Sequence, residues 1–130
     1  MKNKNLEQIR AENAYKATKD AKYAGKGNGE IAKKVPSYIR ENGLLATLAF
    51  ALEKKGKSGD YANDGMKRVL DAVAGHLADS RIARLNASDA DSEAWIKYLI
   101  AEASSDELRD QTAETMAYLS YFRRFAHKEE

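Results

Sequence analysis

Apolar and polar residues recur along this chain with the spacing of helices rather than of strands. The clearest repeat has spacings of three and four, and it is formed by Met66, Val69, Leu70, Val73 and Leu77. It predicts a helix that begins at Tyr61 or Asp64 and ends at Leu77. No stretch alternates apolar and polar residues over the length of a strand. The pattern therefore predicts an all-α fold, a compact bundle of five to seven helices in a single domain over residues 1–130.

The N-terminal segment predicts a helix followed by a break. Asn5 precedes the first apolar positions and is a favourable N-cap residue, so we expect the helix to begin after Asn5 and to end near Ala24. Glycines at positions 25, 27 and 29 then indicate a loop that carries Lys26. Because this loop follows a helix rather than a strand, it does not match a nucleotide-binding fingerprint.

Two further helices are expected on either side of Gly43. The first spans residues 30–42 and contains Pro36, which either kinks the helix or restarts it from a new first turn. Gly43 can adopt the positive φ that ends a helix. Residues 44–52 are apolar on nearly all sides, which is typical of a helix at the centre of a core.

Acidic and hydroxyl residues mark the starts of two C-terminal helices. Residues 88–93 precede an apolar face on which Trp95 is expected to anchor the core. Ser104 and Glu107 form a Ser-x-x-Glu capping box, which predicts the start of the last helix. We expect Tyr118 on a flank of that helix. Its predicted inner face consists of Leu108, Thr112, Thr115, Leu119, Phe122 and Ala126.

Few side chains are suited to catalysis or metal binding. The absence of cysteine excludes disulfide scaffolds, thiolate nucleophiles and Cys-based zinc sites. His76 has no acidic partner on its own helix face, and His127 is 51 positions away, so we expect His76 to be a packing or boundary residue rather than a ligand. No Gly-x-Ser-x-Gly elbow is present. We therefore expect a protein that is not an enzyme and that needs no cofactor and no metal.

The sequence also argues against a membrane protein. Its longest uncharged stretch, residues 42–52, has 11 residues, whereas a transmembrane helix needs roughly 20. The first seven residues lack the apolar run of a secretory signal. We expect a cytoplasmic protein with no membrane contact.

The net charge of +2 hides an asymmetry along the chain. Residues 1–57 carry 13 Lys or Arg against 6 Asp or Glu, a net charge of +7. Residues 58–130 carry 9 against 14, a net charge of −5. Such a split favours a basic surface that meets an anion such as nucleic acid and a second surface that meets protein. A dipolar surface that only keeps the protein soluble remains the alternative.

The candidate nucleic-acid contacts lie mostly in the first two helices. Lysines of the first helix alternate with tyrosines, and this combination suits RNA because ammonium groups neutralise phosphates and rings stack on bases. The same residues also fit an ordinary solvated helix face. The predicted RNA-binding residues are Lys16, Lys19, Lys22, Lys26, Lys33 and Arg40. Less favoured candidates follow in the segment after Leu52, namely Lys54, Lys55 and Lys57.

Three blocks of sequence resemble a known family. They are the opening Leu6-Glu7-Gln8-Ile9-Arg10-Ala11, the central Val35-Pro36-Ser37-Tyr38-Ile39 with Asn42-Gly43-Leu44-Leu45-Ala46-Thr47-Leu48-Ala49-Phe50, and the closing Ala117-Tyr118-Leu119-Ser120-Tyr121-Phe122-Arg123-Arg124-Phe125-Ala126. Together they are similar to the small all-helical subunit of the Cmr complex, the type III-B CRISPR effector. Residues 56–93 contain no matching motif, so the resemblance covers about half of the chain.

The resemblance implies a non-catalytic subunit. Small subunits of this family stack in several copies beside a filament of backbone subunits and line the groove in which target RNA pairs with guide RNA. The implied partners are other Cmr subunits (the backbone and large subunits), further copies of the chain, guide RNA and target RNA. Two alternatives stay open at this stage: a helical adaptor of another assembly without an RNA role, and a DNA-binding helix-turn-helix with its turn at Asn42-Gly43.

Overall fold

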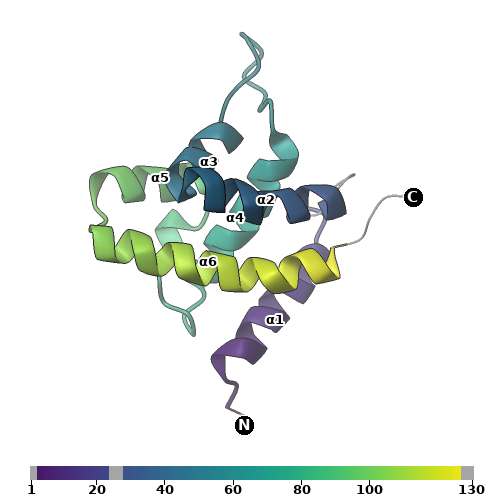
Figure 1. The fold of residues 1–130 in the computed structure, drawn as a ribbon, viewed down its shortest axis with the longest axis vertical. Coiled ribbons are helices and arrows are strands. Elements are labelled where there is room, and N and C mark those ends of the chain that lie inside the picture. Colours follow the sequence, from purple (N-terminus) through teal and green to yellow (C-terminus); the bar gives the residue numbers. More distant parts are fainter. Residues whose placement is uncertain (1–2, 24–27, 127–130) are drawn as a thin grey trace.

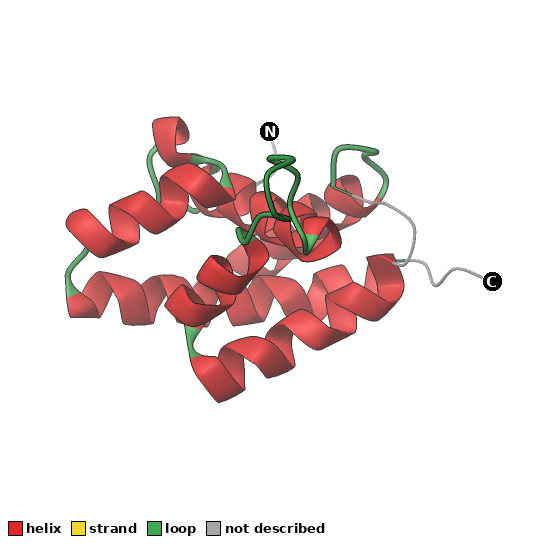
Figure 2. Cartoon of the chain, turned by 90° about the horizontal axis from the view of Figure 1, so that it is seen from above, coloured by secondary structure: helices red, strands yellow, loops and turns green. Residues whose placement is uncertain are grey.

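Six α-helices and one short 3₁₀ helix form the regular structure of the residues that the computed structural model describes, which are 3–23 and 28–126. Within these residues there is no strand, as Figure 2 shows, and a single antiparallel bridge joins Lys54 to Tyr61. The all-α prediction is therefore confirmed. In chain order the elements are α1 (Leu6–Thr18), α2 (Asn28–Asn42), α3 (Leu44–Ala51), α4 (Asp64–Ala78), η1 (Ala87–Asp89), α5 (Ser92–Ala101) and α6 (Ser105–Phe125).

Helix α4 is the centre of the bundle. It packs against α1, α2, α3, α5 and α6, while α1 packs chiefly along α6 (Figure 1). Eight of the 15 residues of α4 are buried. The prediction that the apolar segment after Gly43 forms the central helix is wrong, because α3 lies at the side of the bundle and leaves Ala46 and Ala49 exposed. Alanine is small enough that its exposure costs little, so an all-apolar sequence does not require burial on every side.

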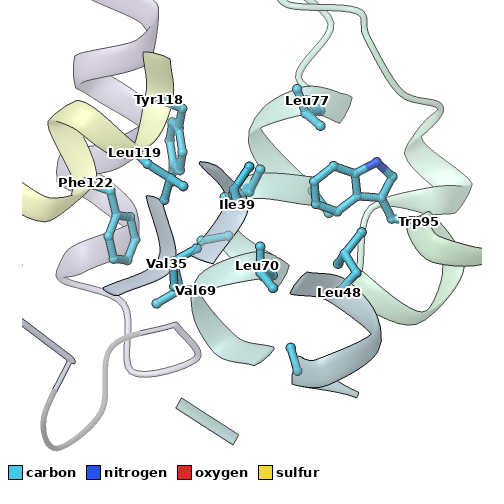
Figure 3. Packing of buried hydrophobic residues seen from close by; sticks show 14 of the residues in the cluster. Val35, Ile39, Leu48, Val69, Leu70, Leu77, Trp95, Tyr118, Leu119 and Phe122 are labelled. Carbon is cyan, nitrogen blue, oxygen red and sulfur yellow. The ribbon is translucent and has the colours of Figure 1, made fainter. Parts of the chain in front are cut away.

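One hydrophobic core joins helices α2 to α6. Figure 3 shows side chains from these five helices converging, and each labelled side chain is at most 3% exposed. Trp95 is fully buried, as predicted, and its indole Nε1–H donates to Gln111 Oε1 at 2.8 Å. Burial of each such large side chain contributes about 1.5–3 kcal/mol. This shared core fixes α2 and α6 relative to one another.

The caps of the helices follow the predicted signals. Asn5 and Gln8 cap α1 reciprocally, and Ser104 and Glu107 do the same for α6. Gly43 has φ +88° at the junction of α2 and α3. Helix α2 is continuous through the buried Pro36, so the alternative of a restarted helix does not hold.

Helix α1 is shorter and α2 is longer than predicted. Helix α1 ends at Thr18 rather than near Ala24, because the Asp20 side chain accepts a hydrogen bond from the Lys22 backbone N–H at 2.9 Å and so favours a turn over a further helical turn. Helix α2 begins at Asn28, within the stretch that the glycines predicted as a loop.

The buried face of α6 is rotated from the predicted one. Tyr118 is fully buried rather than on a flank, and Gln111 and Glu114 are also buried. Leu108 and Thr112 are only half-buried. Polar side chains with hydrogen-bond partners therefore take up inner positions that an apolar count assigns to solvent.

Candidate nucleic-acid interface

A basic surface forms where the C-terminal end of α6 meets the first half of α2. Lys33 of α2 lines a hollow together with Arg123, Arg124 and Ala126. Lys33 and Arg40 are seven residues apart, so they lie on the same face of α2, and both are exposed. The two arginines occupy the last turn of α6, where the negative end of the helix dipole favours cations.

The end of α1 adds an aromatic ring and a further cation beside this surface. Tyr15 is 55% exposed, and its ring meets Phe125 of α6 edge to face with 5.5 Å between ring centroids. Lys19 Nζ lies 5.2 Å from the centroid of the Tyr15 ring. Figure 1 shows the ends of α1 and α6 and the start of α2 on the same side of the molecule. We call the exposed residues gathered here the basic end: Tyr15, Lys19, Lys33, Arg123 and Arg124.

Two of the other predicted lysines lie among carboxylates. Lys16 Nζ is 3.6 Å from Glu12 Oε1, and Lys16 lines a pocket that also contains Asp20 and Asp79. Lys22 lines a different hollow, with Asp71, Asp91 and Glu93 as well as Lys67 and Lys97. Nearby carboxylates reduce the attraction that these lysines exert on phosphate.

The remaining predicted cations are dispersed. Arg40 lies beyond Lys33 along α2 and donates to Ser37 Oγ at 3.3 Å. Lys54, Lys55 and Lys57 lie on a separate surface, the loop between α3 and α4. Lys26 lies outside the described residues. The structure thus brings Lys19 and Lys33 to one end of the bundle with two arginines, and it does not gather the other predicted residues there.

A buried polar cluster holds α1 in place and so positions the basic end. Glu114 of α6 accepts from Arg10 Nε and Nη2 at 2.8 and 2.7 Å, and its Oε2 lies 2.9 Å from His76 Nε2. Asn13 Nδ2 lies 2.9 Å from His76 Nδ1. Because Asn13 Nδ2 is a donor, His76 Nδ1 accepts, and the imidazole proton resides on Nε2 and is donated to Glu114. The His76 ring also stacks on Tyr118 at 4.3 Å.

The protonation states of this cluster follow from its burial and contacts. Burial lowers the pKa of His76 more than the neighbouring Glu114 raises it, so the imidazole is neutral. Burial works to raise the pKa of Glu114, but hydrogen bonds from Arg10 and His76 outweigh burial and leave it lowered. The cluster is therefore an Arg10–Glu114 ion pair braced by a neutral histidine. His76 is a packing residue as predicted, but its acidic partner comes from another helix.

A second ionic layer connects α1 to the turn after α4. Asn13 Nδ2 donates to Asp79 Oδ2 at 3.0 Å, and Arg81 bonds to both Asp79 and Glu12. Hydrogen bonds from Lys4 and Arg81 lower the pKa of Glu12 to about 2. Arg81 and Asn13 likewise hold the pKa of Asp79 well below its usual range. Helix α1 buries few large apolar side chains, so these polar contacts determine much of its placement.

The site has residues that sequence reasoning did not assign to RNA. Arg123 and Arg124 belong to the acidic half of the chain, so the charge count pointed away from them. Their signal was present in the pair of arginines at the end of the last helix, next to Phe125.

The chemistry of the basic end is that of an anion-binding surface. Guanidinium and ammonium groups neutralise phosphates, and the Tyr15 ring beside them is 55% exposed. Among the described residues, no group of three His, Asp or Glu side chains is placed to hold a metal ion. No helix in the described part of the chain has the length and apolar character needed to cross a bilayer.

Comparisons with known proteins agree on one family. The family model for a CRISPR-associated protein, Cas_Cmr5, matches residues 6–129. The fold is similar to the X-ray crystal structure of a CRISPR-associated Cmr5 family protein from Thermus thermophilus, with a TM-score of 0.68. That match covers 94% of this chain and 95% of the other at 24% sequence identity. The chain therefore belongs to the Cmr5 family of CRISPR-associated proteins and is a small subunit of the Cmr (type III-B) CRISPR complex.

Proposed function

We propose that this chain is a non-catalytic small subunit that stacks along the backbone filament of the Cmr effector and lines the guide–target RNA duplex with basic residues. The observation that carries the proposal is the basic end, where Lys33 of α2 and the arginine pair of α6 line one hollow. The partners are the backbone and large subunits, further copies of this chain, guide RNA and target RNA.

The character of the basic end suits contact with a duplex backbone. Base pairing between guide and target supplies the sequence recognition, so the protein needs only to neutralise phosphates. Lys33, Arg123 and Arg124 are exposed and come from two helices that the core holds together. Of the six cations predicted from sequence, Lys19 and Lys33 are the two that the structure places at the basic end.

The distribution of charge along α6 supports stacking. The first two turns of this helix carry three carboxylates, Asp106, Glu107 and Asp110, of which Asp106 pairs with Arg109 and Asp110 with Arg84. Its last turn carries Arg123 and Arg124. A helix of 21 residues is about 31 Å long, so the two groups lie at opposite ends of the molecule (Figure 1). Contact between the acidic end of one copy and a basic surface of the next is heterologous and continues as a filament.

The test measures RNA affinity in the complex reconstituted with the other Cmr subunits, because single contacts add up along an assembled filament. We expect the double variant Lys33→Ala/Arg124→Ala to weaken target-RNA binding and to reduce the slope of log K against log salt by about two, one for each lost phosphate contact. The control Lys97→Ala/Arg109→Ala removes the same charge from exposed positions on α5 and α6. Equal affinity and slope for wild type, variant and control would refute the role of the basic end.

A further inference from the structure

The loop between α3 and α4 is an ordered hairpin that projects from the bundle. Residues 53–60 are all exposed, and Figure 1 shows the loop extending beyond the helices at the top of the view, whereas α1 and α6 end at the right. Its two arms pair through Lys55 N–H to Asp60 O at 2.8 Å and Ala62 N–H to Glu53 O at 2.9 Å. Gly56 and Gly59 adopt φ of +42° and +82° at the turn. We call residues 53–62 the α3–α4 hairpin.

The lysines of the hairpin lie at its base and at its tip. At the base, Lys54 Nζ and Lys67 Nζ lie 5.4 and 4.8 Å from the centroid of the Tyr61 ring. Because Lys67 belongs to α4 and Tyr61 to the hairpin, this cation–π contact joins the base of the hairpin to α4. At the tip, Lys55 and Lys57 are exposed, and neither forms an ion pair with a carboxylate within the described part of the chain. The tip therefore presents two exposed ammonium groups that lack an ion-pair partner among the described residues.

The composition of the hairpin fits a nucleic-acid partner better than a protein partner. Residues 53–60 contain no aromatic and no aliphatic side chain, so this segment has no apolar anchor of the kind that carries protein–protein binding energy. The two carboxylates, Glu53 and Asp60, flank the tip, and the tip itself has none. Gly56 and Gly59 have no side chains, so a partner can approach the backbone of the tip closely. A segment that offers positive charge but no apolar side chains is suited to contact the phosphate backbone of a nucleic acid.

We propose that the α3–α4 hairpin is a second RNA contact, in which Lys55 and Lys57 bind phosphates of the guide–target duplex at a point distinct from the basic end. This inference rests on the proposed RNA role of the chain. One subunit would then touch the duplex at two separated positions, the basic end and the hairpin tip. The paired arms of the hairpin reduce the backbone entropy that is lost when the lysines bind.

Photo-crosslinking in the reconstituted complex tests the contact directly. The chain has no cysteine, so Ser58→Cys at the tip accepts a single thiol-linked photo-crosslinker, and Ser105→Cys at the start of α6 is the matched control. We expect Ser58→Cys to crosslink to guide or target RNA and Ser105→Cys not to. A crosslink from the tip to a protein subunit only, or no crosslink above the control, would overturn the proposal.

A charge variant distinguishes failure of this inference from failure of the proposed function. We expect Lys55→Ala/Lys57→Ala to lower the salt slope of RNA binding by about two and the affinity by at least tenfold, with unchanged helical circular dichroism. The Lys97→Ala/Arg109→Ala variant again controls for net charge. If the hairpin variant binds like wild type while Lys33→Ala/Arg124→Ala is impaired, the hairpin proposal fails alone. If both bind like wild type, the RNA role itself fails.

Discussion

At the scale of single residues, Glu114 is the side chain on which the placement of α1 depends most. It is 4% exposed and accepts hydrogen bonds from Arg10 and His76. Glu114→Ala leaves the Arg10 guanidinium and the His76 Nε2–H without their acceptor in a mostly buried site. We expect a loss of about 2–4 kcal/mol in the free energy of unfolding, measured by urea denaturation.

Two further variants show whether that loss comes from the cluster. Glu114→Gln keeps the size of the side chain and one acceptor oxygen, so it should cost less than Glu114→Ala. Glu93→Ala removes an exposed carboxylate and should change stability by less than about 0.5 kcal/mol. An equal effect of all three substitutions would contradict the assigned role of Glu114.

The same residue shows where sequence analysis ends. Trp95 in the core, the caps at Asn5 and Ser104, and the turn at Gly43 are local features, and all were predicted from neighbouring residues. Glu114 is 38 positions from His76, and only the packing of α6 on α4 brings the two together. Sequence patterns assign a carboxylate such as Glu114 to the solvent side of a helix. Because Glu114 is buried, the inner face of α6 was predicted incorrectly.

At the scale of elements, Gly43 joins α2 to α3 in a conformation that other residues rarely adopt. Its φ of +88° and ψ of 162° lie in a region available almost only to glycine. Gly43→Ala meets no neighbouring atom, so its cost is backbone strain alone. We expect a loss of about 1–3 kcal/mol in the free energy of unfolding, measured by urea denaturation.

A second glycine gives the control for that prediction. Gly75 lies inside α4, and an added Cβ would be 3.6 Å from Tyr23 Oη, an ordinary contact. Gly75→Ala should therefore be neutral or stabilising by up to about 1 kcal/mol, since alanine favours a helix. If the two substitutions had the same effect, strain at Gly43 would not be its cause.

The sequence predicted the type of each secondary-structure element better than its first and last residues. The three–four repeat located α4 to within a few residues because a buried helix must keep its apolar face in register. The end of α1 was missed because it depends on one hydrogen bond that the Asp20 side chain accepts from the Lys22 backbone N–H. The pattern of the surrounding residues is otherwise compatible with a helix. The central role of α4 was missed because it depends on how many neighbours a helix has, not on its own composition.

At the scale of the whole molecule, the candidate interface is assembled from parts distant in the sequence. Lys33 and Arg123 are 90 positions apart and belong to halves of opposite net charge, yet they line one hollow. A charge count along the chain cannot reveal this, because folding mixes the halves. Of the lysines and tyrosines in the pattern predicted for the first helix, Lys19 and Tyr15 lie beside Phe125 of α6 at the basic end.

The charges that join α1 to α4 and α6 also predict how stability depends on pH. The pKa of His76 is lowered by burial, so below about pH 6.5 the unfolded chain takes up a proton that the folded chain does not, and stability falls. The pKa values of Glu12, Asp79 and Glu114 are lowered too. Their contribution is complete above about pH 4.5 and is lost as pH falls further. Urea denaturation followed by Trp95 fluorescence should show both decreases.

The variant His76→Gln isolates the first of these two decreases. It removes the buried histidine, whose pKa differs between the folded and unfolded states, so we expect a lower stability at pH 7.5 but little change between pH 7.5 and 5.5. The decrease below pH 4.5 should remain, because Glu12 and Asp79 keep their partners in Arg81. A wild-type stability that stays constant from pH 7.5 to 5.5 would show that His76 takes up protons equally in both states. Below about pH 6.5 the cluster would then contain a charged histidine paired with Glu114, and α1 would stay docked in mild acid.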